Sequence, residues 1–112
     1  MQSRNIIKAT AALKAARELL TNAEHWTKES SARKADGTAC HVMNENAKCW
    51  CALGALERSG ANTYYIHRAL DKLRINNTIS AYNDHAKTTH DDVLKMFDVA
   101  IELSESAEPG YV

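Results

Sequence analysis

An unbroken apolar run, Cys49–Leu56, constrains the fold of this chain more than any other feature. Asn44 or Asn46 can supply an N-cap before it, so we expect a helix over Ala47–Arg58. A helix that is apolar on all sides is buried on all sides. Gly54 costs about 1 kcal/mol relative to alanine inside a helix, which predicts a close backbone contact there. The run therefore predicts a central element that the rest of the chain surrounds.

Three further helices are predicted around it. The first, Ile6–Leu20, has small and branched apolar residues at helical spacing. The second, Thr63–Arg74, follows a helix stop at Gly60. The last begins after a capping box and fades near Ser106. Its apolar residues match the i, i+3, i+4, i+7, i+8 template; they are Val93, Met96, Phe97, Ala100 and Ile101.

The capping box of the last helix consists of Thr89 and Asp92. Before it, we expect a connecting loop that contains Ile79 and Tyr82 and runs to Thr88. Asn62 is the expected N-cap of the preceding helix.

The segment 21–46 has the weakest pattern. Trp26 stands alone among polar residues, and we expect it to tuck back onto the core. Asp36-Gly37 is a turn dipeptide, so Lys34-Ala35 and Thr38-Ala39 can pair as a very short hairpin. The alternative is an irregular loop. The prediction is an all-α fold: a small four-helix domain with a long ordered loop, or a short β-hairpin, between its first two helices.

Composition limits the class of protein. The 112 residues indicate a single domain, 1–112, with a frayed tail from about residue 107. Fourteen basic and fourteen acidic side chains give no net charge, which argues against a protein that coats nucleic acid. No apolar run reaches the ~18–20 residues that cross a bilayer, and a signal-peptide pattern is missing. Three cysteines, an odd number, then favour free thiols in the cytoplasm.

Several motifs together resemble a known family. They are Trp50-Cys51-Ala52-Leu53-Gly54-Ala55-Leu56, then Asn83-Asp84, then Thr89 leading into Val93-Leu94, Phe97 and Ala100-Ile101. Upstream, Trp26-Thr27 and Ala32-Arg33-x-Ala35-Asp36-Gly37 also look similar to that family's loop. The chain resembles, from about Leu13 to Leu103, small bacterial and phage proteins that form a domain of unknown function. The resemblance implies no activity, and Cys40, His41 and Cys49 lie outside its pattern.

Two enzymatic or metal sites are weak alternatives. Cys40, His41, Cys49 and Cys51, with His25 nearby, contain zinc-ligand types, but their spacing does not fit the common frameworks. A nucleophilic Cys51 would need a histidine such as His85 or His90, with Asn83 or Asp84 to orient it. The set for this hydrolase is Cys51, Asp84 and His90. We expect Cys51 to lie beyond the first helical turn among apolar neighbours, where burial raises its pKa. We therefore expect no metal, no cofactor and no catalytic residue.

A helix-turn-helix DNA binder is the main rival hypothesis. The helices on either side of Ser59-Gly60-Ala61-Asn62 have that layout. Side chains that would face a groove are Thr63, Tyr64, His67, Arg68 and Lys72. Leu56 stands where a small alanine is usual, and the chain is neutral, so nucleic acid is not the expected partner.

We therefore predict a non-enzymatic module that binds another protein, such as a host or regulatory factor if the chain comes from a phage. The expected surfaces are the loop 26–43 and the exposed aromatic side chains, because aromatic anchors dominate interface energetics. The Asn83-Asp84 loop is either a recognition loop or a structural turn. The candidate binding residues are Trp26, Tyr64, Tyr65, Tyr82, Asn83 and Asp84.

Overall fold

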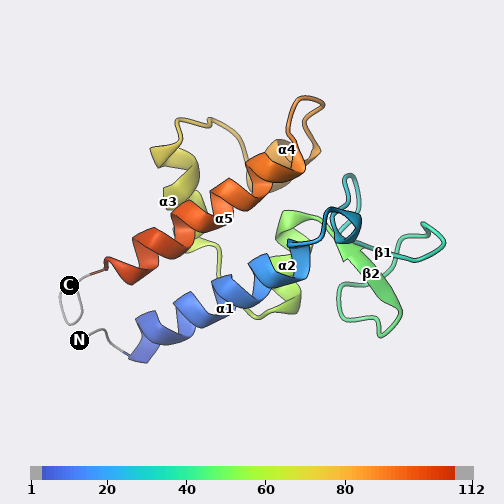
Figure 1. The fold of residues 1–112 in the computed structure, drawn as a ribbon, viewed down its shortest axis with the longest axis horizontal. Coiled ribbons are helices and arrows are strands. Elements are labelled where there is room, and N and C mark those ends of the chain that lie inside the picture. Colours follow the sequence, from blue (N-terminus) through green and yellow to red (C-terminus); the bar gives the residue numbers. More distant parts are fainter. Residues whose placement is uncertain (1–3, 108–112) are drawn as a thin grey trace.

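Two long antiparallel helices, α1 (Arg4–Leu20) and α5 (His90–Glu105), lie side by side along the molecule (Figure 1). The computed structural model describes residues 4–107. α1 buries Leu13, Ala16 and Leu20, and α5 buries the apolar residues predicted from its periodicity apart from a half-buried Ile101. These two helices form the main wall of the core.

The other elements complete a mostly helical domain. α3 packs on α5, α2 packs on α1, and a two-stranded antiparallel sheet lies between α1 and α2 in the sequence. Among the described residues there are five α-helices, four of them substantial, so the predicted helical fold with a hairpin after the first helix is confirmed. The bounds are η1 (Ala23–His25), β1 (Ala32–Lys34), β2 (Ala47–Trp50), α2 (Ala52–Arg58), α3 (Tyr64–Lys72) and α4 (Ile79–Asp84).

The prediction of a helix over Ala47–Arg58 is wrong in its first part. Ala47–Trp50 forms strand β2, in which Ala47 and Trp50 are buried and Lys48 is exposed. Its register opposite β1 pairs Ala32 with Trp50. Because Cys51 has extended backbone angles, α2 begins only at Ala52. Backbone pairing with a distant strand, which local spacing cannot reveal, outweighs the helical pattern here.

The predicted turn at Asp36-Gly37 is confirmed. Gly37 N donates to Lys34 O at 2.9 Å, Lys34 N donates to Thr38 O at 2.9 Å, and Gly37 has φ 88°. Arg33 bridges Ala39 on this side, while β2 pairs with the other edge of β1. The expected short hairpin is therefore present in part: Lys34 bonds to Thr38, but Ala39 pairs with Arg33, and Ala35 lies in the turn.

The connecting loop predicted through Ile79 and Tyr82 is also wrong in part. Residues Ile79–Asp84 form α4, and the side chain of Thr78 caps it by accepting from Ala81 N at 3.0 Å. Ile79 and Asn83, one turn apart, are buried. A helix of six residues is too short for hydrophobic periodicity to reveal it.

Helix ends match the remaining predictions in part. Thr89 and Asp92 form the predicted capping box of α5. The N-cap of α3 is Thr63 rather than Asn62, although Asn62 Oδ1 accepts from Tyr64 N at 3.0 Å. The predicted frayed tail around Pro109-Gly110 lies outside the described residues.

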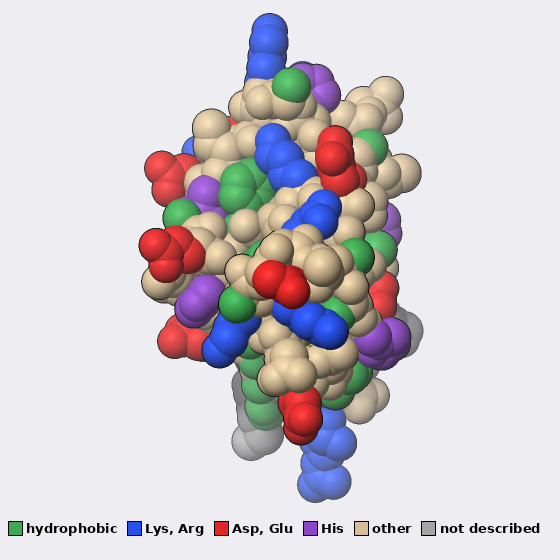
Figure 2. Space-filling view, turned by 90° about the vertical axis from the view of Figure 1, so that its right-hand side faces the viewer, with side chains coloured by type: hydrophobic (Ala, Val, Ile, Leu, Met, Phe, Trp, Pro, Cys, Tyr) green, Lys and Arg blue, Asp and Glu red, His purple; other side chains and the backbone are tan. Residues whose placement is uncertain are grey.

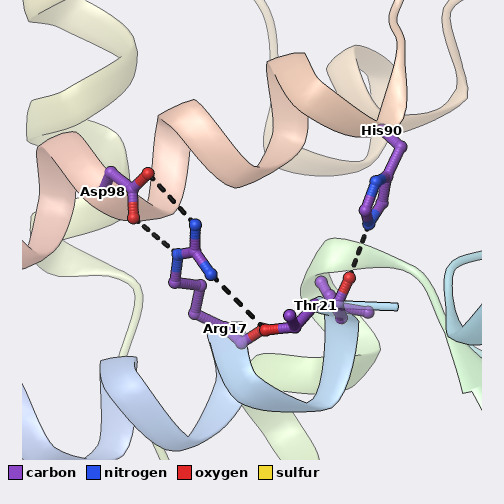
Figure 3. A network of polar contacts seen from close by, with 5 residues as sticks. Arg17, Thr21, His90 and Asp98 are labelled. Atoms are coloured by element: carbon purple, nitrogen blue, oxygen red, sulfur yellow. Dashed lines mark hydrogen bonds and ion pairs between the residues drawn. The ribbon is translucent and has the colours of Figure 1, made fainter. Parts of the chain in front are cut away.

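Polar contacts join α1 to α5 along their length. Arg17 Nε and Nη2 donate to the two carboxylate oxygens of Asp98, and the hydrogen bond to Asp98 raises the pKa of the Arg17 guanidinium (Figure 3). His90 Nε2 is hydrogen-bonded to the Leu20 carbonyl at 2.5 Å, where α1 ends and α5 begins. These contacts fix the register of the two helices.

Candidate functional site

Asn83, near the end of α4, is fully buried and joins two other parts of the chain, the segment Trp26-Thr27 and the start of α2. Its Oδ1 accepts hydrogen bonds from Trp26 Nε1 at 2.7 Å and from Ala52 N at 3.0 Å. Its Nδ2 donates to Thr27 O at 3.1 Å and to the Asp84 carboxylate at 2.9 Å. An amide side chain has two donors and two acceptor positions, so all four are used within the chain. The geometry gives Asn83 a structural role.

Asp84 and Lys28 make further contacts between α4 and the loop that follows Trp26. The Asp84 carboxylate accepts from Glu29 N at 2.8 Å, and Glu29 has φ 65°, in the left-handed region that ordinary residues rarely adopt. Lys28 Nζ donates to His85 O at 2.6 Å and lies 5.4 Å from the centre of the Trp26 ring. The structure thus brings together three predicted binding residues, Trp26, Asn83 and Asp84, as a junction between loop and helices.

Trp26 packs back on the core, as predicted. Its ring lies 5.8 Å from that of His90, at an angle of 44°. His90 Nε2 is occupied by the Leu20 carbonyl. His90, the candidate base of a cysteine hydrolase, therefore works as a helix-to-helix contact beside Trp26.

The prediction that Cys51 lies beyond the first helical turn is wrong, because α2 starts at Ala52 and Cys51 is its N-cap. Cys51 Sγ accepts from Gly54 N at 3.3 Å. Burial raises the pKa of the Cys51 thiol, while the N–H groups of Gly54 and Leu53 lower it, and the negative charge of Asp84 raises it again. A nucleophilic cysteine needs a thiolate at neutral pH, and this site favours the neutral thiol.

Gly54 makes the close backbone contact that the sequence predicts. A Cβ at this position would lie 2.0 Å from Ser31 O and 2.9 Å from Ser31 C. Ser31 O also accepts from Cys51 N at 3.2 Å. The backbone of the loop before β1 therefore lies directly against the first turn of α2.

Metal-ligand types do not converge in the part of the chain that the structure describes. Residues 4–107 contain no group of three or more His, Cys, Asp or Glu side chains placed to hold a metal ion. Cys40, Cys49 and Cys51 are free cysteines, and His41 Nδ1 accepts from Met43 N at 3.1 Å.

Tyr64, on α3, is the predicted binding residue that faces solvent most openly, with 55% of its surface exposed. Its ring meets the ring of Tyr65 edge-on, with centroids 4.9 Å apart. Arg68 Nη1 donates to the Tyr64 hydroxyl at 3.2 Å, and the guanidinium lies 5.9 Å from the ring centre. Sequence reasoning missed the role of Arg68, which its position four residues after Tyr64 could have indicated.

Tyr82, on α4, is half-buried. Burial raises the pKa of its phenol, and the nearby Asp92 carboxylate raises it further. It lines a hollow of about 340 Å³ with the residues 75–77, 85, 87, 88 and 92.

α2 and α3 are joined by residues 59–63, the connection that the helix-turn-helix hypothesis requires, but they do not pack extensively on each other: α2 packs mainly on α1, and α3 on α5. Tyr64, His67, Arg68 and Lys72 are exposed on α3, whereas α2 buries most of its length. Over the hairpin end of the molecule, basic and acidic side chains are interspersed, with no surface of one sign in that view (Figure 2). The chain has no net charge, which does not favour a groove-reading helix.

The fold and the junction define the class of this protein: a small, mostly helical domain in which Asn83 of the short helix α4 joins the segment before β1 to the start of α2. The chain belongs to a family of unknown function (DUF6197), whose model matches residues 6–103. The resemblance seen in the sequence motifs is thereby confirmed. No curated protein and no solved structure matches the chain. Among the described residues, no helix is long and apolar enough to cross a membrane.

Proposed function

We propose that this protein is a non-enzymatic interaction module that binds a partner protein through α3, with Tyr64 as the anchor. The observation that carries the proposal is that Tyr64 is exposed and yet fixed in place by Tyr65 and Arg68. Tyrosine and arginine are enriched among the residues that dominate interface energetics. A side chain that is already ordered loses less conformational entropy on binding.

We further infer a cytoplasmic, accessory or regulatory role, with a protein of a bacterial host as partner. The free cysteines support a reducing compartment. The host partner rests on the resemblance to small bacterial and phage proteins.

The test is site-specific photo-crosslinking in a bacterial lysate. A benzoylphenylalanine replaces Tyr64, and a matched control replaces Met43, which is 59% exposed on the hairpin side. We expect one protein to be captured from position 64 only, in the presence of nuclease and high salt. With that protein purified, Tyr64→Ala should weaken binding by about tenfold or more, and Met43→Ala should not. Equal capture from both positions contradicts the proposal.

The alternative of a DNA-binding regulator rests on the exposed His67, Arg68 and Lys72 of α3 after a short turn. It predicts a steep loss of affinity with salt for a duplex probe. Duplex binding that Lys72→Gln reduces would favour it over the protein-binding proposal.

A further inference from the structure

A hollow of about 440 Å³ opens between the C-terminal half of α1 and strand β2, which contact each other. Its size lies within the range of small-molecule sites, about 300–1,000 Å³. Sequence reasoning did not identify it, because its two walls lie almost thirty residues apart. The lining residues are Ala15, Glu18, Leu19, His25, Ala47, Lys48 and Trp50.

The β2 side of the hollow is rigid. Trp50 is 6% exposed, and its Nε1 donates to Val42 O at 3.2 Å. The guanidinium of Arg58 lies 5.0 Å from the ring centre and is itself held by Val42 O at 2.7 Å. Ala47 beside it is buried. Because these groups are fixed by the fold, a ligand would meet a preformed apolar floor.

The α1 side adds a second apolar strip, in which Ala15 is exposed and Leu19 is half-buried against the core. Ala15 and Leu19 lie one turn apart, and Glu18 stands beside them in the last turn of the helix. The C-terminus of a helix favours positive charge, and so does the Glu18 carboxylate. This wall therefore favours an ammonium group above an apolar surface.

The opposite wall carries a positive charge. Lys48 is exposed on β2. The two ion pairs found among residues 4–107 are Lys14–Glu105 and Arg17–Asp98, so neither Glu18 nor Lys48 is in a salt bridge there. An apolar floor between one carboxylate and one ammonium group is complementary to a molecule that carries the opposite pair.

We propose that this hollow binds a free amino acid with a bulky apolar side chain. The ammonium group of the ligand pairs with Glu18, its carboxylate pairs with Lys48, and its side chain covers Leu19 and Trp50. The site is separate from the α3 surface, since neither Tyr64 nor Arg68 lines it.

The experiment uses the full chain and four probes that share one phenyl ring. L-phenylalanine carries both the ammonium and the carboxylate group. Phenethylamine carries only the ammonium group, and 3-phenylpropanoate carries only the carboxylate. N-acetyl-phenylalaninamide carries neither charge. The readout is the ¹⁵N NMR signal of the Trp50 indole, with the Trp26 indole as an internal control. We expect saturable shifts of Trp50 with phenylalanine, at a Kd of about 1 mM, and weaker binding of the other probes.

Variants at exposed positions then assign each charge. Glu18→Gln should weaken the binding of phenylalanine about three- to fivefold and leave the affinity for 3-phenylpropanoate unchanged. Lys48→Gln should weaken the binding of phenylalanine by a similar factor and leave the affinity for phenethylamine unchanged. Glu102→Gln and Lys95→Gln, exposed on α5, are the matched controls. The proposal is overturned if no probe shifts Trp50 up to about 10 mM, or if the uncharged probe binds as well as phenylalanine.

Discussion

Gly54→Ala is the substitution that tests the junction most directly. The added Cβ would lie 2.0 Å from Ser31 O, and ordinary contact begins at 3.4 Å. The backbone fixes the position of the Cβ, and Ser31 O is itself a backbone atom, so neither can turn aside as a flexible side chain would. Overpacking of this kind costs about 3 kcal/mol, at the upper end of its usual range. Loss of the hydrogen bond from Cys51 N to Ser31 O adds about 1 kcal/mol. Better helix propensity returns about 1 kcal/mol.

The net expectation is a loss of about 3 kcal/mol in the free energy of unfolding. For a domain of this size that lowers Tm by roughly 12–20 °C. Urea and thermal unfolding followed by circular dichroism measure both quantities. The control is Gly60→Ala, which meets no atom within 4 Å but forces a side chain into φ +71° and should cost about 1 kcal/mol. If Gly54→Ala costs no more than Gly60→Ala, the close contact does not exist as described. Gly54→Leu should abolish folding.

Three further outcomes follow from the same contacts. Asn83→Asp removes two hydrogen-bond donors and buries a charge beside Asp84. It should lower the free energy of unfolding, measured in urea, by about 3 kcal/mol. The control Asn77→Asp, at an exposed position, should leave the free energy of unfolding almost unchanged. Because burial raises the pKa of the Cys51 thiol, its contribution to stability is full below about pH 8.5 and is lost as the pH rises through the folded-state pKa. Iodoacetamide at pH 8 should modify Cys51 more slowly than the other two cysteines, and fastest modification of Cys51 would revive the nucleophile hypothesis. The Arg17–Asp98 pair is partly solvent-exposed, so a double-mutant cycle should give a coupling of only about 0.2–1 kcal/mol, smaller in 1 M salt.

Sequence signals that act within a few residues correctly predicted the helix cap, the helical periodicity and the turn. The capping box at Thr89 and Asp92 and the periodicity after it place α5 correctly, because both act within one helix. The turn at Asp36-Gly37 is set by the conformational freedom of one glycine. Gly54 was identified as a close contact from its cost inside a helix, although its partner, Ser31, was beyond the reach of that argument.

Two of the errors, the missed strand β2 and the missed hollow, come from contact between distant segments, whereas α4 was missed because a helix of six residues is too short to show periodicity. Ala47–Trp50 has a helical composition, but its backbone pairs with β1 and so forms a strand. Cys51 therefore lies at the N-cap of α2 rather than inside the helix, although the expected burial that raises its pKa is present. The hollow between α1 and β2 was missed for the same reason, since Glu18 and Lys48 are neighbours of it only in the fold.

Three of the motifs that carry the family resemblance, Trp26-Thr27, Trp50–Leu56 and Asn83-Asp84, meet at the junction. Gly54 lies against the loop before β1, and Asn83 joins Trp26, the backbone of Thr27 and the start of α2. Arg33 holds the same loop through Thr27 Oγ1 at 3.1 Å and Lys28 O at 3.2 Å, and it also donates to Gly37 O in the turn after β1 at 3.0 Å. These residues are occupied by contacts that form the fold. A buried amide with every hydrogen bond satisfied has nothing left to offer a ligand, so Asn83 serves the architecture of the fold. The proposed binding surfaces lie among exposed residues outside the motif, first Tyr64 and Arg68 on α3 and then Glu18 and Lys48 at the hollow.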